Sequence, residues 1–145
     1  MIVKTVLKQK GNNDVATVTP DMPVMEAARA LHSKRIGALV VIGAENRIVG
    51  ILSERDIVRG MALNDGRMDT LKVHDLMTSS VLVCNPDDSL DLLMGIMTNR
   101  RVRHLPVVEH NRLVGIVTIG DVVKARLEDA TMQVDSLRDY VMTAR

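Results

Sequence analysis

The chain of 145 residues contains no tryptophan and no phenylalanine, and Tyr140 is its single aromatic side chain. Stacking platforms for nucleic-acid bases are therefore missing, and a bound purine would have to lie between aliphatic side chains. The lone cysteine, Cys84, excludes an internal disulfide and any metal site built from several cysteines. No apolar run approaches the roughly 20 residues that cross a bilayer, so no membrane role is expected.

The chain also has no large excess of positive or negative charge, because 19 basic and 18 acidic residues leave a net charge of +1. General nucleic-acid binders usually present a strongly basic face, so nucleic acid is not an expected partner. Residues 1–5 lack the basic and apolar regions of a signal peptide. With 46% hydrophobic and 26% charged residues, the composition predicts a folded, cytoplasmic chain.

What the sequence does contain is an internal repeat. Residues 18–21 (Val-Thr-Pro-Asp) are echoed by residues 84–87 (Cys-Asn-Pro-Asp). Residues 47–51 (Arg-Ile-Val-Gly-Ile) are echoed by residues 112–116 (Arg-Leu-Val-Gly-Ile). Two copies of this length indicate a duplicated unit and not a long solenoid.

The most informative shared stretch is Gly-x-x-Ser/Thr-x-x-Asp, at the end of an apolar run. It places Ser53 and Asp56 three residues apart in the first copy, and Thr118 and Asp121 in the second. One interpretation is an ordinary helix N-cap. The other is a ligand site, since a strand-to-helix turn offers free N–H groups to an anion and a carboxylate can accept from ribose hydroxyls.

Hydrophobic periodicity predicts the order β-α-β-β-α in each copy. The expected strands are residues 15–18, 38–42, 48–52, 81–83, 105–108 and 113–117. Helices are expected from Pro23 to about Lys34, after Asp56, from a cap at Asp88, and from Asp121. Residues 73–77 are expected to form one helical turn. The predicted organisation is an N-terminal arm at 1–14, held loosely, repeats at 15–62 and 81–130, a linker at 63–80, and a C-terminal helix at 131–145.

The last helix carries Val134, Leu137 and Val141 on one face. This apolar face either covers the core of its own chain or forms a dimer contact, and we expect a mixture of the two.

Each copy resembles a CBS domain, and the two together resemble a tandem CBS pair, or Bateman module. The similarity covers about residues 15–130 and is carried by the repeat, by residues 36–41 and 103–108, and by both Asp-containing junctions. It implies an α+β (α/β-like) fold of two repeats in a pseudo-twofold arrangement, with small mixed sheets packed with helices. No catalytic domain accompanies the pair, which indicates a stand-alone module.

The resemblance also implies two clefts that bind adenosine-containing ligands, with AMP the first expectation, NAD, NADH or ATP next, and S-adenosylmethionine also known in the family. By this resemblance, the first cleft would use Thr118, Asp121, Arg103, His104, Thr17, Val18 and Thr19. The second cleft would use Ser53, Asp56, Arg55, Gly37, Ala38, Val83, Cys84 and Asn85.

The second cleft departs from the stronger pattern, because Gly37 and Ala38 replace the basic pair Arg103 and His104. Arg55 is the candidate substitute. Arginine suits phosphate, since its guanidinium forms a fork for phosphate oxygens. We therefore expect a nucleotide monophosphate at Asp121 and a second, weaker or larger adenosyl ligand at Asp56.

No nucleophile with its base, no paired carboxylates and no metal cluster emerge, so neither catalysis nor a catalytic cofactor is expected. The favoured function is a regulatory sensor that transmits ligand state to an unidentified effector protein, working as a homodimer. The alternatives are a ligand-independent dimerisation scaffold and, last, an enzyme that processes the bound nucleotide. Cys84 is expected to be a small buried hydrophobe.

Overall fold

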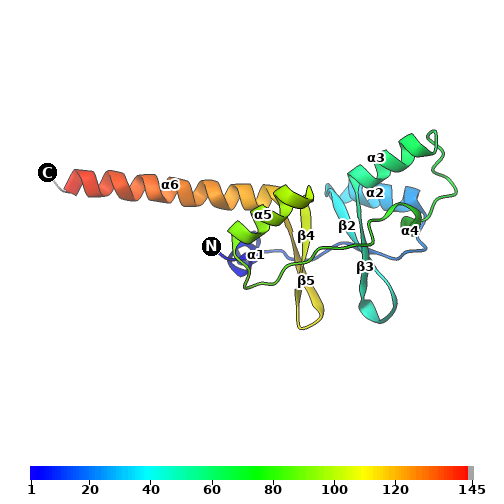
Figure 1. Ribbon diagram of the computed structural model, residues 1–145, viewed down its shortest axis with the longest axis horizontal. Coiled ribbons are helices and arrows are strands. Elements are labelled where there is room, and N and C mark those ends of the chain that lie inside the picture. The colour runs from blue at the N-terminus through cyan, green and yellow to red at the C-terminus, as the bar shows by residue number, and fades with distance from the viewer. Residues whose placement is uncertain (144–145) are drawn as a thin grey trace. The chain divides into compact units, whose positions relative to one another are not determined.

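The computed structural model describes residues 1–143 (Figure 1). Its elements, in chain order, are α1 (Val3–Lys10), β1 (Thr17–Val18), α2 (Val24–Lys34), β2 (Ala38–Ile42), the 3₁₀ turn η1 (Ala44–Asn46), β3 (Ile48–Ser53), α3 (Glu54–Leu63), α4 (Val73–Leu76), α5 (Leu90–Arg100), β4 (His104–Glu109), β5 (Arg112–Thr118) and α6 (Ile119–Thr143). The chain divides into two compact units. Residues 14–82 form the first-repeat unit, and residues 1–13 with those from 83 onward form the second-repeat unit.

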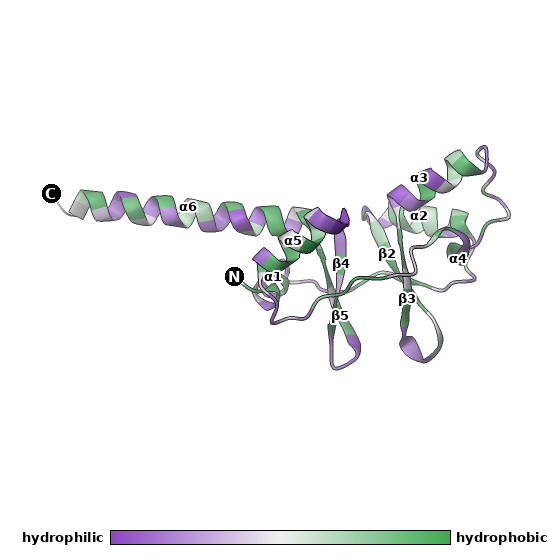
Figure 2. Ribbon diagram, in the orientation of Figure 1, coloured by the Kyte–Doolittle hydropathy of each residue, from purple (hydrophilic) through white to green (hydrophobic). Residues whose placement is uncertain are grey.

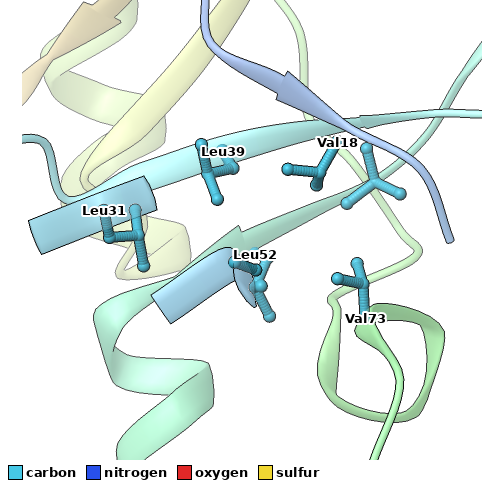
Figure 3. Close-up of a cluster of buried hydrophobic side chains, with 7 residues drawn as sticks. Val18, Leu31, Leu39, Leu52 and Val73 are labelled. Atoms are coloured by element: carbon cyan, nitrogen blue, oxygen red, sulfur yellow. The ribbon is translucent and has the colours of Figure 1, made fainter. Parts of the chain in front are cut away.

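The first-repeat unit contains a three-stranded mixed sheet in the order β1-β2-β3. Strand β1 runs parallel to β2, and β2 runs antiparallel to β3. The helices α2 and α4 pack against this sheet and bury an aliphatic cluster (Figure 3). Its members are Val18, Ala27, Leu31, Leu39, Val41, Leu52 and Val73. Because these side chains come from strands and helices alike, the sheet and its helices form one core.

The second-repeat unit contains the antiparallel hairpin β4-β5. Its turn lies at His110 and Asn111, which both adopt left-handed backbone angles with φ of 50° and 61°. The strand predicted at residues 81–83 is wrong. Residues 81–83 are not a strand, because they make no ladder hydrogen bonds. A single parallel bridge joins Cys84 to Val107 instead. The predicted α+β class with small mixed and antiparallel sheets is nevertheless confirmed.

The N-terminal segment is not the loosely held arm that the sequence suggested. It forms α1, in which Val3 and Val6 are buried. The Val3 N–H donates to the Asp88 carbonyl at 2.9 Å, and the Lys4 N–H donates to the Pro86 carbonyl at 2.8 Å. Buried valines and these two hydrogen bonds hold α1 against the second-repeat unit.

Two helix boundaries also differ from the sequence prediction. The cap of α5 is Ser89, whose hydroxyl accepts from the Leu92 N–H at 3.1 Å. Asp88 instead accepts from the Asn85 N–H at 2.8 Å and closes the preceding turn. At the C-terminus, the helix expected from Asp121 and the separate segment expected at 131–145 form one continuous helix, α6, whose last two predicted residues lie outside the described range.

The helix α1 and the segment that follows α4 each lie against a glycine of a neighbouring strand. A Cβ added at Gly115 would lie 2.8 Å from Leu7 Cδ2, and one added at Gly50 would lie 2.5 Å from Met77 Sδ and 3.1 Å from the Thr78 carbonyl. The close approach of Met77 and Thr78, just after α4, therefore requires glycine at position 50.

Replacing Gly50 with alanine should destabilise the protein by about 1–3 kcal/mol, because the added methyl overpacks this contact. Gly95 is the control, because it lies inside α5 and, apart from its chain neighbours and the backbone of its own helix, no atom lies within 4 Å of the Cβ position there. Gly95→Ala should stabilise by about 0.5–1 kcal/mol through helix propensity. Urea unfolding measures both, and a Gly50→Ala variant as stable as the wild type would contradict this packing.

The thiol of Cys84 is buried, and burial, aided by the negative charge of Asp88, raises its pKa to about 12. Because only the thiolate reacts, iodoacetamide at pH 8.5 should leave the folded protein unmodified and should label it fully in denaturant. Mass spectrometry measures the labelled fraction. Rapid labelling of the folded chain would show that the thiol is accessible and would contradict its burial.

Candidate functional site

The Thr118–Asp121 pair forms the junction between β5 and α6. The Thr118 N–H donates to Asp121 Oδ2 at 2.9 Å, and the Asp121 N–H donates to Thr118 Oγ1 at 3.1 Å. This reciprocal exchange is a capping box. The structure therefore confirms the N-cap interpretation of the motif. The Asp121 carboxylate lies at the positive end of α6, a helix of 25 residues.

A lysine that the sequence analysis did not single out completes this junction. Lys10, at the end of α1, donates to Asp121 Oδ2 at 2.9 Å and to the Ile116 carbonyl at 2.9 Å. The two residues lie 111 positions apart in the chain, so no local pattern could have connected them. Only the packing of α1 against β5 and α6 brings them together.

The pKa of Asp121 reflects opposing influences. Burial acts to raise it, but the hydrogen bonds from Thr118 and Lys10, together with the positive charge of Lys10, outweigh burial and hold the pKa of this carboxyl below its usual value. Asp121 is thus ionised at neutral pH, which is the state that accepts hydrogen bonds from hydroxyl groups.

The predicted basic pair lies beside the same junction. His104 is opposite Thr118 in the β4-β5 hairpin, and the Arg103 carbonyl accepts from the Ile119 N–H at 2.9 Å. The Arg103 side chain is exposed. The second-repeat unit therefore brings together four residues predicted for one cleft: Thr118, Asp121, Arg103 and His104.

A cavity of about 320 Å³ lies beside Asp121, between α1 and α6. It is lined by Val6, Gln9, Lys10, Asp121, Lys124, Ala125 and Glu128. Both lysines are ammonium donors and both acidic groups are acceptors, so the cavity can take a polar ligand that offers hydroxyl groups and negative charge.

The first-repeat unit contains the matching capping box at Ser53 and Asp56. Gly37 and Ala38 hold the places of the basic pair: the Gly37 carbonyl accepts from the Glu54 N–H at 3.0 Å, and Ala38 is opposite Ser53. Arg55 lies one residue before Asp56, on the first turn of α3, with its side chain exposed. This junction has the same backbone hydrogen bonding as the other one, but no basic side chain stands at the two positions that match Arg103 and His104.

Asp56 carries more contacts than Asp121 does. Its carboxylate accepts from the Ser53 N–H at 2.9 Å and from the Ser53 hydroxyl at 3.1 Å. It also accepts from the Thr78 hydroxyl at 3.2 Å and from the Arg59 guanidinium. At 4% exposure, it is a buried charge that its own unit neutralises.

The remaining predicted residues belong to the opposite units. Thr17, Val18 and Thr19 lie at and just after β1 in the first-repeat unit, whereas Asp121 lies in the second-repeat unit. Val83, Cys84 and Asn85 lie in the second-repeat unit, whereas Asp56 lies in the first-repeat unit. Their contribution to the two predicted clefts stays a prediction.

Within residues 1–143, no three His, Cys, Asp or Glu side chains are grouped so that they could hold a metal ion. None of the described helices is both long enough and apolar enough to cross a bilayer.

Comparison with known proteins gives consistent results. The family description "CBS domain" matches residues 6–63 and 73–128. A 17.7 kDa protein of Acidianus ambivalens is 38% identical over 130 residues, which cover 89% of this chain and 77% of that protein. The mitochondrial CBS domain-containing protein CBSX3 of Arabidopsis thaliana is 30% identical, with coverages of 96% and 71%.

Solved structures agree with this match. A CBS-domain protein of Agrobacterium tumefaciens is 46% identical with a TM-score of 0.82, covering 86% of this chain and 92% of its own. The CBS domain pair of protein MJ0100, solved in complex with 5′-methylthioadenosine and S-adenosyl-L-methionine, is 28% identical with a TM-score of 0.75, covering 90% and 98%. The duplicated junctions and these matches place the chain in the CBS-domain family, with two copies of the domain.

Proposed function

We propose that the chain is a regulatory module that binds an adenosine-containing nucleotide and passes its ligand state to a partner protein. The observation that carries this proposal is the ionised Asp121, held by its capping box beside Arg103 and His104. A carboxylate accepts from the vicinal hydroxyls of a ribose, and a guanidinium with an imidazole suits a phosphate group. The sugar and the phosphate of one nucleotide thus find partners at one junction.

The similarity to the MJ0100 pair supports the adenosine part of the ligand, because that protein is described in complex with two adenosine derivatives. The phosphate part rests on Arg103 and His104 alone. We propose AMP as the first ligand, with NAD, NADH or ATP next. The module acts in the cytoplasm and without catalysis, by favouring the conformation that binds the nucleotide more tightly.

We propose further that the module works as a homodimer through α6. An apolar row follows this helix at a spacing of three and four residues: Val123, Leu127, Ala130, Val134, Leu137 and Val141 (Figure 2). The five larger side chains of this row are 47–65% exposed. The sequence analysis predicts a mixture of core cover and dimer contact for this face, and the exposure of the row favours the contact.

A second copy of the same helix is the occupant that fits this row. Residues spaced three and four apart form the seam of a two-helix coiled coil, in which each apolar row packs against another. The half of α6 beyond Ala130 is exposed at every described side chain. A single helical extension of this length is marginal in water, so pairing would supply the packing that stabilises it.

The ligand prediction is tested by thermal unfolding of the protein, freed of co-purified nucleotide, with AMP, ATP, NAD, NADH, S-adenosylmethionine and adenosine. A ligand at about 100 times its Kd adds roughly 2.7 kcal/mol to the stability, which raises the melting temperature by several degrees. We expect AMP to give a larger shift than adenosine. No shift from any of these compounds would contradict the proposal and favour the scaffold.

The same assay tests whether Arg103 binds the phosphate group of the ligand. Arg103→Ala should weaken AMP by at least about tenfold and adenosine by less than about twofold, because only the phosphate loses a partner. Arg112→Ala, at the far end of the hairpin where Arg112 is opposite Glu109, is the matched control. Equal losses for AMP and adenosine would show that Arg103 acts on the fold and not on the ligand.

The dimer prediction is tested with Leu137→Glu, which places a charge within the apolar row, in the exposed half of α6. Light scattering should give the mass of two chains for the wild type and of one chain for the variant, since an unpaired buried charge disfavours association. Ser136→Glu adds the same charge to the same helix beside the row and should stay dimeric. A wild-type monomer, or a dimeric Leu137→Glu variant, would exclude α6 as the interface.

A further inference from the structure

The carboxylates of the two junctions differ in how many of their acceptor sites the protein itself uses. Ser53 fills Asp56 Oδ2 with its N–H and its hydroxyl, while Thr78 and Arg59 fill Oδ1. A carboxylate offers about four acceptor positions, so these contacts saturate Asp56. With its side chain only 5% exposed, it has no position left for a ribose hydroxyl.

The contacts of Asp56 fasten separate segments of the first-repeat unit together. Thr78 is paired with β3 through hydrogen bonds of 2.9 Å in both directions with Ile51. Its hydroxyl therefore meets Asp56 at a fixed place, and the same carboxylate holds Arg59 on α3. A ligand that takes Asp56 would have to break these contacts.

The carboxylate of Asp121, in contrast, keeps an acceptor position that residues 1–143 do not fill. The Thr118 N–H and Lys10 both donate to Asp121 Oδ2, and the Thr118 hydroxyl also lies close to this carboxylate. No hydrogen bond of ordinary geometry reaches Oδ1 from the described residues, so this oxygen is available. Its side chain is 21% exposed and lines the cavity between α1 and α6. A hydroxyl group can approach this carboxylate without displacing the capping box.

The contact with Lys10 is also exchangeable. The lysine side chain is 28% exposed, and part-exposed ion pairs of this kind stabilise a fold only weakly. If Lys10 leaves Asp121, its ammonium stays close to the site, where a negatively charged ligand provides a new partner.

We propose that the two repeats have divided their roles, so that the chain binds one nucleotide, at Asp121, while Asp56 is a structural carboxylate. The nucleotide half of this inference rests on the proposed function. The structural half concerns Asp56 alone and requires no ligand.

The nucleotide half is tested by isothermal titration with AMP. Wild-type protein should bind one AMP per chain, and Asp121→Asn should weaken that binding at least about tenfold, because the ribose loses a charged acceptor. Thr78→Val, a change at the other junction, should keep one AMP per chain with an affinity within about twofold. Binding of two AMP per chain, or of one AMP with unchanged affinity in Asp121→Asn, would overturn the proposed division of roles between the repeats.

The structural half is tested by thermal unfolding without ligand, so it can fail independently of the proposed function. In Asp56→Asn, the amide NH₂ must face a donor whichever way it turns, because both oxygens accept in the wild type. In Asp121→Asn, the amide oxygen can keep the Thr118 N–H while the NH₂ takes the Oδ1 position.

Asp56→Asn should therefore lower the melting temperature at least about twice as much as Asp121→Asn does. Should Asp56→Asn fail to fold, Thr78→Val, which removes a single donor, takes its place and should still be less stable than the wild type. A loss for Asp121→Asn that equals or exceeds that of Asp56→Asn would overturn the structural role, as would a Thr78→Val variant with wild-type stability.

Discussion

Each repeat depends on the hydrogen bonds exchanged between a hydroxyl residue that ends a strand and an aspartate three residues later. Ser53 with Asp56 and Thr118 with Asp121 satisfy backbone N–H groups that the first helical turn leaves without intrahelical partners. The same bonds fix the direction in which each helix leaves its strand. Because the aspartate is negatively charged at the positive end of the helix, the box also sets the local field that any ligand meets.

One capping geometry supports two different environments because the residues around it come from other parts of the chain. In the first-repeat unit, Thr78 and Arg59 surround Asp56 and bury it. In the second-repeat unit, Lys10 touches one oxygen of Asp121 and leaves the carboxylate part-exposed beside a cavity. The duplicated motif thus supplies the scaffold, and the neighbours determine which copy remains available to a ligand.

Local pattern was sufficient to predict much of this fold. The apolar runs gave β2, β3 and the β4-β5 hairpin close to their observed bounds, since each is dense in β-branched residues and bounded by turn residues. The duplicated junctions predicted the residues that cap α3 and α6, and they carried the resemblance to the CBS-domain family. The placement of Arg103 and His104 at the junction of Thr118 was also predictable, because the hairpin register brings the start of β4 to the end of β5.

What escaped prediction depends on contacts between distant segments. Residues 1–14 were predicted to be a loosely held arm, but Val3–Lys10 form a helix whose valines are buried in the second-repeat unit. Lys10 and Thr78 were not predicted as partners of the aspartates, because each lies far from its aspartate in the sequence and meets it only through the packing of α1 and of the segment after α4. The strand expected at 81–83 reduces to one bridge at Cys84, because strand propensity does not form a ladder without a paired neighbour.

The central claim, that the Asp121 junction binds the nucleotide, is tested most directly by an NMR titration of ¹⁵N-labelled protein with AMP. The account predicts that the backbone amides of Thr118, Gly120 and Asp121 and the side chain of Arg103 shift together and saturate at one AMP per chain, while the amides of Ser53 and Asp56 stay in place. Shifts centred on Ser53 and Asp56, or none at either junction, would contradict it.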